Sequence, residues 1–186
     1  MSSLKAFLPK LSEIIGISAD ALYSRQRALV QLGVLNAKPG RGPGSGAPLE
    51  AHNLAALLLA LLCADSLQET DDKVRLLCEA RPTDVKKCRL TGATTLQEAV
   101  AMLLTNPELL KKIDGISVHQ GPLFPQHSLP HLNWYAAIYY ARGTMVSSFE
   151  AKQQRADLLP AVRIQLSTDH ATLTRIAHAF AEETAQ

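Results

Sequence analysis

Apolar residues recur at spacings of three and four at the start of the chain, which is the period of one helix face. They are Leu4, Phe7, Leu8, Leu11, Ile14 and Ile15. Pro9 falls inside this run and predicts a break or a new helix start, because proline is tolerated in a first turn but not in a helix interior. Gly16 predicts the end of the helix. A second helix is expected from a cap at Ser18 or Asp20 to Leu32.

The middle of the chain has the most apolar helix pattern. Residues 54–64, LAALLLALLCA, carry no charge, so this helix is expected to be buried on several sides. It is too short to cross a bilayer, which needs about 20 apolar residues. Another helix should start within residues 66–71, where Ser66 and Glu69 form one candidate capping box, and should end at Pro82.

The last part of the chain mixes helix and strand patterns. Thr95 and Glu98 form a capping box, and Asn106 with Pro107 predicts a short helix that runs to residue 113. Four segments have the composition of strands: Ile116–His119, Trp134–Arg142, Met145–Glu150 and Val162–Leu166. A terminal helix is expected to begin at residue 168 or 169, with Leu173, Ile176, Ala177 and Phe180 on its inner face.

Composition limits the choice of function classes. The chain of 186 residues is 47% hydrophobic and 19% charged, which is typical of a globular protein, and its net charge of +2 does not by itself indicate a nucleic-acid partner. Cys63, Cys78 and Cys88 are not spaced for a metal site and are expected to be reduced and structural. We expect no signal peptide, no membrane partner and a cytoplasmic location.

Residues 11–32 have the pattern of a helix-turn-helix, in which a tight turn joins a short helix to a second helix with a free outer face. Gly16, Ile17 and Ser18 form the turn, with Ile17 pointing inward. The inner face of the second helix carries Leu22, Leu29 and Leu32. The outer face presents Asp20, Tyr23, Ser24, Arg27 and Gln31, with Arg25 to one side. Side chains of these kinds read base edges or contact phosphates.

A glycine-rich loop follows the second helix. Lys38 and Arg41 make it positive, and its glycine backbone can approach a phosphate closely. The segment NAKPGRGPGSGAPL resembles a wing, which is a two-stranded hairpin with a flexible basic tip. This resemblance implies strands at Val34–Lys38 and Ala47–Glu50. The first 50 residues contain six basic and three acidic side chains, an excess larger than that of the whole chain.

The stretch GISADALYSRQRALVQLGVL resembles the helix-turn-helix of bacterial winged-helix transcription regulators. The order of helix, recognition helix, wing and following helix is similar to MerR-type domains, over about the first 60 residues. The matching positions are Gly16, Ile17, Ser18, Leu22, Arg25 or Arg27, Leu29, Gly33, Val34 and Leu35. Double-stranded DNA is therefore the expected partner, with no cofactor. The expected DNA contacts are Ser18, Asp20, Tyr23, Ser24, Arg25, Arg27, Gln31, Lys38 and Arg41.

The expected fold is mainly α with a C-terminal α+β module and an N-terminal winged helix-turn-helix. Residues 1–65 are assigned to the DNA-binding domain, 66–90 to a helical connector and 91–186 to an α+β domain for dimerisation or sensing. Both faces of Trp134–Arg142 are apolar or aromatic, which favours a central strand, a subunit interface or a small-ligand pocket. We expect a homodimer that binds an inverted repeat and regulates transcription. The sequence identifies no small-molecule effector.

Other interpretations of these segments stay open. The Gly-Ile-Ser turn also occurs in ordinary helical packing, and the glycine-rich loop is also typical of a flexible linker. A phosphate-binding P-loop is excluded because no Lys-Ser or Lys-Thr pair follows the glycines. The alternative function is a phage-type DNA-binding assembly or scaffold protein without promoter regulation.

Catalytic and metal-binding motifs receive little support. His119, His127 and His131 are clustered, but Pro125 and Pro130 predict a loop, so we expect no metal site. No nucleophile motif or zinc-protease motif is present. We therefore expect no catalytic residues and no enzymatic activity.

Overall fold

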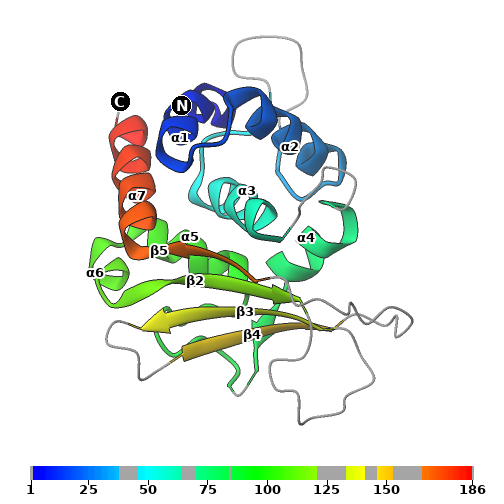
Figure 1. Cartoon of the computed structure of the whole chain (residues 1–186), viewed down its shortest axis with the longest axis vertical. Helices are drawn as coiled ribbons and strands as arrows, with labels where there is room; N and C mark the ends of the chain where they lie inside the picture. Colours follow the sequence, from blue (N-terminus) through cyan, green and yellow to red (C-terminus); the bar gives the residue numbers. More distant parts are fainter. Residues whose placement is uncertain are drawn as a thin grey trace.

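The computed structural model describes residues 2–37, 46–63, 70–83, 85–120, 133–140, 146–152 and 165–185. The helices are α1 (Leu4–Ile15), α2 (Ala19–Gln31), α3 (Ala51–Cys63), α4 (Thr70–Cys78), α5 (Leu96–Thr105), α6 (Pro107–Leu110) and α7 (His170–Thr184). The strands are β1 (Arg81–Pro82), β2 (Ile113–Gln120), β3 (Asn133–Tyr140), β4 (Val146–Lys152) and β5 (Gln165–Asp169). Helices fill the upper part of the molecule in Figure 1, and the sheet forms its base.

Local side-chain chemistry sets the ends of the first two helices. The Ser3 hydroxyl accepts a hydrogen bond from the backbone N–H of Ala6 and caps α1. Gly16 ends α1 in the left-handed conformation with φ 74°, as predicted. Ser18, one of the two expected caps, begins α2. The turn between α1 and α2 therefore consists of residues 16–18.

Pro9 does not break the first helix, contrary to the prediction. It lies inside α1, which is continuous from Leu4 to Ile15. Pro9 has no N–H to donate to the Lys5 carbonyl four residues earlier. Both residues are exposed, so the carbonyl lies on the solvent side of the helix, where the loss of one hydrogen bond costs least.

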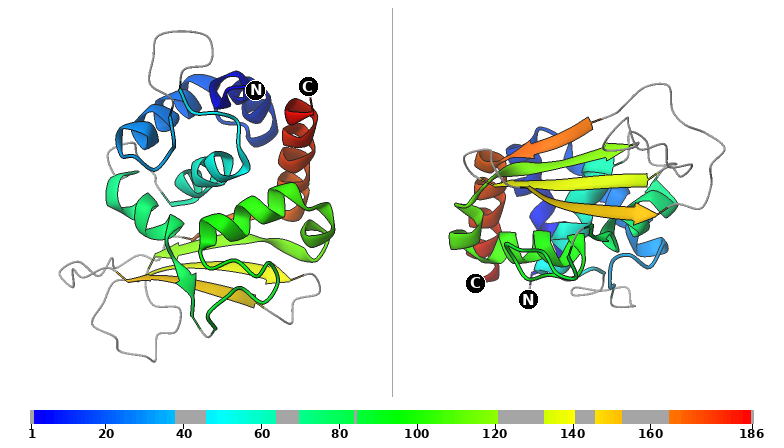
Figure 2. Two further views of the ribbon diagram at one scale, coloured as in Figure 1. Left: turned by 180° about the vertical axis from the view of Figure 1, so that it is seen from behind. Right: turned by 90° about the horizontal axis from the view of Figure 1, so that it is seen from below.

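The five strands form one antiparallel sheet in the order β1-β4-β3-β2-β5. The view from below shows the sheet in front of the helical layer (Figure 2). The prediction of a central strand is confirmed for β3, where Ala136, Ala137 and Ile138 are all buried. The fold therefore combines helices with an antiparallel sheet. This confirms the prediction that the chain contains both helices and strands.

Several strand limits differ from the prediction. Strand β2 starts at Ile113, so the short helix that was expected to reach residue 113 ends at Leu110 instead. Strand β5 covers Gln165–Asp169, and residues 162–164 of the predicted strand lie outside the described residues. Strand β1 was not predicted, because it contains only two residues and one of them is Pro82. Its position at the edge of the sheet tolerates proline.

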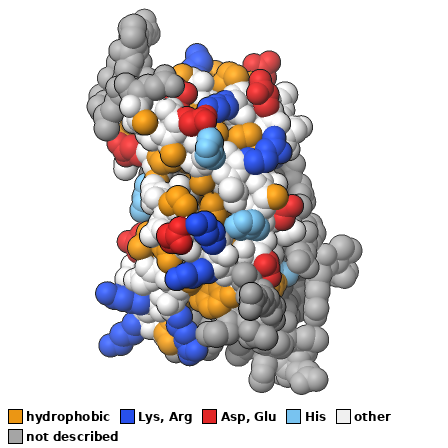
Figure 3. All heavy atoms as spheres, turned by 90° about the vertical axis from the view of Figure 1, so that its left-hand side faces the viewer, with side chains coloured by type: hydrophobic (Ala, Val, Ile, Leu, Met, Phe, Trp, Pro, Cys, Tyr) orange, Lys and Arg blue, Asp and Glu red, His pale blue; other side chains and the backbone are white. Residues whose placement is uncertain are grey.

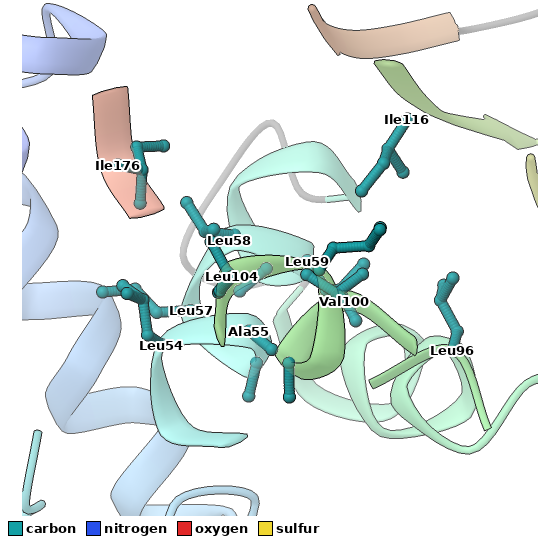
Figure 4. Packing of buried hydrophobic residues seen from close by; sticks show 14 of the residues in the cluster. Leu54, Ala55, Leu57, Leu58, Leu59, Leu96, Val100, Leu104, Ile116 and Ile176 are labelled. Atoms are coloured by element: carbon teal, nitrogen blue, oxygen red, sulfur yellow. The ribbon is translucent and has the colours of Figure 1, made fainter. Parts of the chain in front are cut away.

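Helix α3 is the centre of the hydrophobic core, as its composition predicts. It packs against α2, α4, α5, β2 and β5. In Figure 4, Leu57 and Leu59 point away from each other, and Leu59 points toward Val100 of α5 and Ile116 of β2. Of the helices within the described ranges, none combines the length and the apolar content needed to cross a bilayer.

The core continues between segments that are distant in the sequence. Residues of α1, α3, α5 and α7 belong to one buried cluster, and the terminal helix buries the four residues that the pattern predicts. Cys63, Cys78 and Cys88 are buried and free, as expected. The first two helices are thus fixed to the sheet through α3 and α7.

Candidate nucleic-acid interface

The α1–turn–α2 unit is held by packing from several sides. Helix α2 packs against α1, α3 and α4, and α1 packs against α7. Ile17, in the turn, is half-buried and packs against the core as predicted. The Arg75 guanidinium of α4 also donates a hydrogen bond to the carbonyl of Leu32, the C-cap of α2. The unit is therefore packed against the rest of the fold through α3, α4 and α7.

The inner face of α2 combines two predicted residues with one that the sequence analysis missed. Leu22 and Leu29 are fully buried, and Gln26 between them is 5% exposed. The Gln26 side-chain oxygen is buried without a hydrogen-bond partner. The burial of Gln26 could have been predicted from the sequence, because Gln26 lies four residues after Leu22 and therefore on the same helix face.

The outer face of α2 is a row of four exposed polar side chains. Asp20, Ser24, Arg27 and Gln31 follow one another at helical spacing, and each is exposed. Ser18 is also exposed, but its hydroxyl oxygen accepts a hydrogen bond from the Ala21 N–H at 3.3 Å. Ser18 therefore acts as a helix cap, whereas the four side chains of the row are exposed to solvent and accessible to a partner.

Tyr23 lies beside this row and contacts α1. The Lys5 ammonium is 4.6 Å from the centroid of the Tyr23 ring, which is a cation–π contact between the two helices. Lys5 is exposed, whereas Tyr23 is half-buried. The sequence analysis counted Lys5 in the local charge but did not place it at the site, because only the fold brings α1 next to Tyr23.

The Arg25 side chain is directed toward the protein interior and does not belong to the exposed row of α2. It is half-buried, and one guanidinium nitrogen is buried without a hydrogen-bond partner. Burial raises the pKa of the Cys63 thiol, at the end of α3, to about 12. The positive charges of Lys73 and Arg25 lower this pKa and offset only part of the rise. Arg25 is therefore placed between α2 and α3.

The predicted wing is not formed as expected by the described residues. Residues 34–37 form no strand, because the N–H groups of Val34 and Leu35 both donate to the Leu29 carbonyl and continue the end of α2. Residues 47–49 pair instead with the start of the chain: the Leu4 N–H donates to Ala47 and the Leu49 N–H donates to Ser2. Lys38 and Arg41, at the predicted tip, lie outside the described residues.

The described residues near the exposed row of α2 carry few basic groups. Lys10 of α1 is bound to Glu182 of α7 at 2.5 Å, so its charge is largely compensated. Among the described residues, Arg27 within the row, Lys5 of α1 and Arg75 of α4, beside the end of α2, are exposed basic groups, and Asp20 carries the opposite charge. On the side that carries α7, acidic and basic side chains alternate over the upper half of the molecule (Figure 3).

A second group of basic residues lies in the loop before α5. Lys86, Lys87 and Arg89 are all exposed. The sequence analysis did not select them, although the run KKCR was a visible signal. The loop before α5 lies at the sheet end of the molecule, away from α2 (Figure 1).

His119 takes part in a hydrogen-bonded cluster on β2 and β3. The Ser117 hydroxyl oxygen lies 2.7 Å from His119 Nε2 and donates to the Tyr139 hydroxyl at 3.2 Å. Burial lowers the pKa of His119. Ser117 is only 1% exposed, so its hydroxyl links the strands and is not open to a substrate.

The metal prediction involved two further histidines. His127 and His131 lie outside the described residues. Within the ranges that the structure describes, no group of three or more His, Cys, Asp or Glu side chains is placed to hold a metal ion.

Comparison with protein-family models, with curated proteins and with solved structures gives no match to this chain. Functional inference therefore depends on the chain's own residues. Within the described part of the chain, α2 presents an exposed polar row, and its opposite face is buried in the core.

Proposed function

We propose that this protein binds double-stranded DNA by placing the outer face of α2 in the major groove. The proposal depends on one observation: Asp20, Ser24, Arg27 and Gln31 form a continuous exposed row on α2, the second helix of the α1–turn–α2 unit. An α-helix fits the major groove, and its side chains can reach base edges there.

The chemistry of the row matches the groups that bases present in the major groove. Arg27 can donate two hydrogen bonds to guanine, and Gln31 can both donate to and accept from adenine. Ser24 can contact either kind of base, and Asp20 can accept from the amino group of cytosine. The row spans about 16 Å at 1.5 Å per residue, so it can cover several adjacent base pairs.

Contacts to phosphate are expected on both sides of the row. The start of α2 lies at the exposed residue Ser18, and helix starts favour anions. Lys5 adds a cation at the other helix, where the first helix of such a unit crosses the DNA backbone. These groups position the protein but do not select a sequence.

One such unit has few phosphate contacts, which favours binding as a pair. We propose a homodimer formed through residues 91–186, with each copy reading one half of an inverted repeat, and a role in regulating transcription. The packing of α3 against α5 supports this arrangement, because it fixes each reading helix relative to the C-terminal part of the chain. Light scattering of the full chain, with and without duplex, measures its molar mass and tests whether the homodimer forms.

The base-reading proposal is tested by selecting duplexes from a random library with the full chain. Wild-type protein is expected to select a consensus, and the S24A/R27A double variant is expected to lose preference at the contacted positions. The loss should be about 1–3 kcal/mol for each base position concerned.

Arg175 of α7 offers a matched control. It is exposed but lies on a different helix, so R175A should select the wild-type consensus. Selection of one consensus by wild type and by S24A/R27A would exclude α2 as the reading helix.

A further inference from the structure

A cavity of about 460 Å³ lies where the α1–turn–α2 unit meets the sheet and α7. One wall is formed by Ile14, Ile15 and Ile17, at the end of α1 and in the turn. Further walls come from the end of α3, from β5 and from the first turns of α7. Small-molecule sites in proteins are of this size.

The lining has an apolar part and a polar part. The apolar part consists of seven aliphatic side chains: Ile14, Ile15, Ile17, Leu58, Leu61, Leu62 and Ile176. Figure 4 shows Ile176 of α7 pointing toward Leu58 of α3 across this region. The polar part is contiguous in sequence and consists of Ser167, Thr168, Asp169 and Thr172.

Asp169 gives the polar end a negative charge. One of its carboxylate oxygens accepts the Thr172 N–H at 2.8 Å, which caps α7. Hydrogen bonds from the Thr172 backbone and side chain lower the pKa of Asp169, so it is ionised at neutral pH. The Ser167, Thr168 and Thr172 hydroxyls can accept further hydrogen bonds from a bound group.

We infer that this cavity is a binding site for a small amphiphile with an aliphatic body and a protonated amino group. The seven aliphatic side chains match the body, because burying apolar surface is the main favourable contribution to such binding. The Asp169 carboxylate and the neighbouring hydroxyls match the amino group, which has only donors. A carboxylate head group would face the Asp169 charge and is disfavoured.

Occupancy of this cavity would act on the proposed DNA-binding helix. Ile17 belongs both to the cavity wall and to the turn that begins α2, so a ligand against Ile17 bears on the position of the outer row. This regulatory step depends on the proposed function, whereas the binding site does not. A ligand changes DNA affinity only by its difference in affinity for the two arrangements of the turn.

The test is calorimetric titration of the full chain with three probes that share one aliphatic body: n-octylamine, n-octanol and octanoate. Saturable binding at one site is expected, with n-octylamine tightest and octanoate weakest. L61W, which places an indole in the cavity, should weaken all binding at least tenfold. D169N keeps the helix cap, because Asn caps as well as Asp, but should weaken n-octylamine about fivefold and leave n-octanol unchanged.

Each outcome decides the assignment. Absence of saturable binding, or equal affinity in wild type and L61W, would overturn the site. If L61W fails to fold, D169N decides, because equal n-octylamine affinity in D169N and wild type would overturn the amine assignment. Tighter binding of octanoate than of n-octylamine would also overturn the amine assignment.

The regulatory step is measured separately by fluorescence anisotropy of a selected duplex. Saturating n-octylamine should change the duplex affinity of wild type at least threefold and leave that of L61W unchanged. Binding of n-octylamine without any duplex binding would remove the DNA function and keep the site. Equal duplex affinity with and without n-octylamine would overturn the coupling.

Discussion

The Lys5 ammonium lies over the Tyr23 ring, 4.6 Å from its centroid, and this contact joins α1 to α2 on the surface proposed to face DNA. The ring holds the ammonium beside the outer row while leaving the lysine exposed. A lysine fixed in this way is suited to a phosphate contact, because part of its conformational freedom is already lost before binding.

Replacement of Lys5 by Ala should weaken binding to every duplex and leave base preference unchanged. The slope of log affinity against log salt should fall by about 0.9, the value for one phosphate contact. Anisotropy titrations at several salt concentrations measure it. K111A is the control, because Lys111 is an exposed lysine at the C-cap of α6 and not on α1 or α2. Equal slopes for K5A and wild type would remove Lys5 from the interface.

Gly16→Ala should lower the free energy of unfolding by about 1 kcal/mol. Nothing lies within 4 Å of the Cβ that this change adds, so the cost comes from the left-handed backbone at φ 74°. Urea unfolding followed by circular dichroism measures the change. An unchanged midpoint would mean that the turn relaxes to another conformation without cost.

Gly115→Ala should be more harmful than Gly16→Ala, for a different reason. The added Cβ would lie 2.4 Å from the backbone oxygen of Thr168 on the neighbouring strand β5. The pairing between β2 and β5 must open, and overpacking of this kind costs about 1–3 kcal/mol or more. Hydrogen exchange should accelerate at the β5 amides, and protection equal to wild type would contradict the close approach.

Stability should decrease at alkaline pH because of two buried thiols. Burial raises the pKa of Cys63 and of Cys78 from 9.0 to about 12. Between these pH values the unfolded chain loses two protons that the native protein keeps, so their stabilisation is complete below pH 9 and is lost as pH rises toward 12. Each thiol should lower the free energy of unfolding by about 1.4 kcal/mol per pH unit in this window.

The C63A/C78A double variant tests the origin of this pH dependence. It retains every other titrating group, so its unfolding free energy should fall less steeply than that of wild type between pH 9 and pH 10.5. Urea unfolding at these pH values gives both slopes. Parallel slopes would show that the native thiols ionise as readily as unfolded ones.

Elements with local causes could be predicted from the sequence. Gly16 ends α1 and Ser18 begins α2 because the left-handed turn and the hydroxyl cap each depend on residues within one helical turn. The capping box of Thr95 and Glu98 forms for the same reason. The exposed row of α2 also follows from local periodicity, given the buried positions of Leu22 and Leu29.

Features that depend on distant segments could not be predicted in this way. The wing was placed by analogy, whereas residues 47–49 pair with residues 2–4, and no local signal specifies that partner. Arg25 was assigned to DNA because of its charge, but the packing of α3 beside α2 partly buries it. The cavity at Ile17 likewise needs α7, which follows more than 150 residues later.

The most direct test of the central proposal is the change in backbone amide chemical shifts when the isotope-labelled full chain is titrated with its selected duplex. The largest changes are expected across Ala19–Gln31, above all at Ser24 and Arg27, with a smaller set around Lys5. Changes confined to Lys86, Lys87 and Arg89 would assign DNA binding to the loop before α5 instead. That result, or no change with any duplex, would contradict the account of α2 as the reading helix.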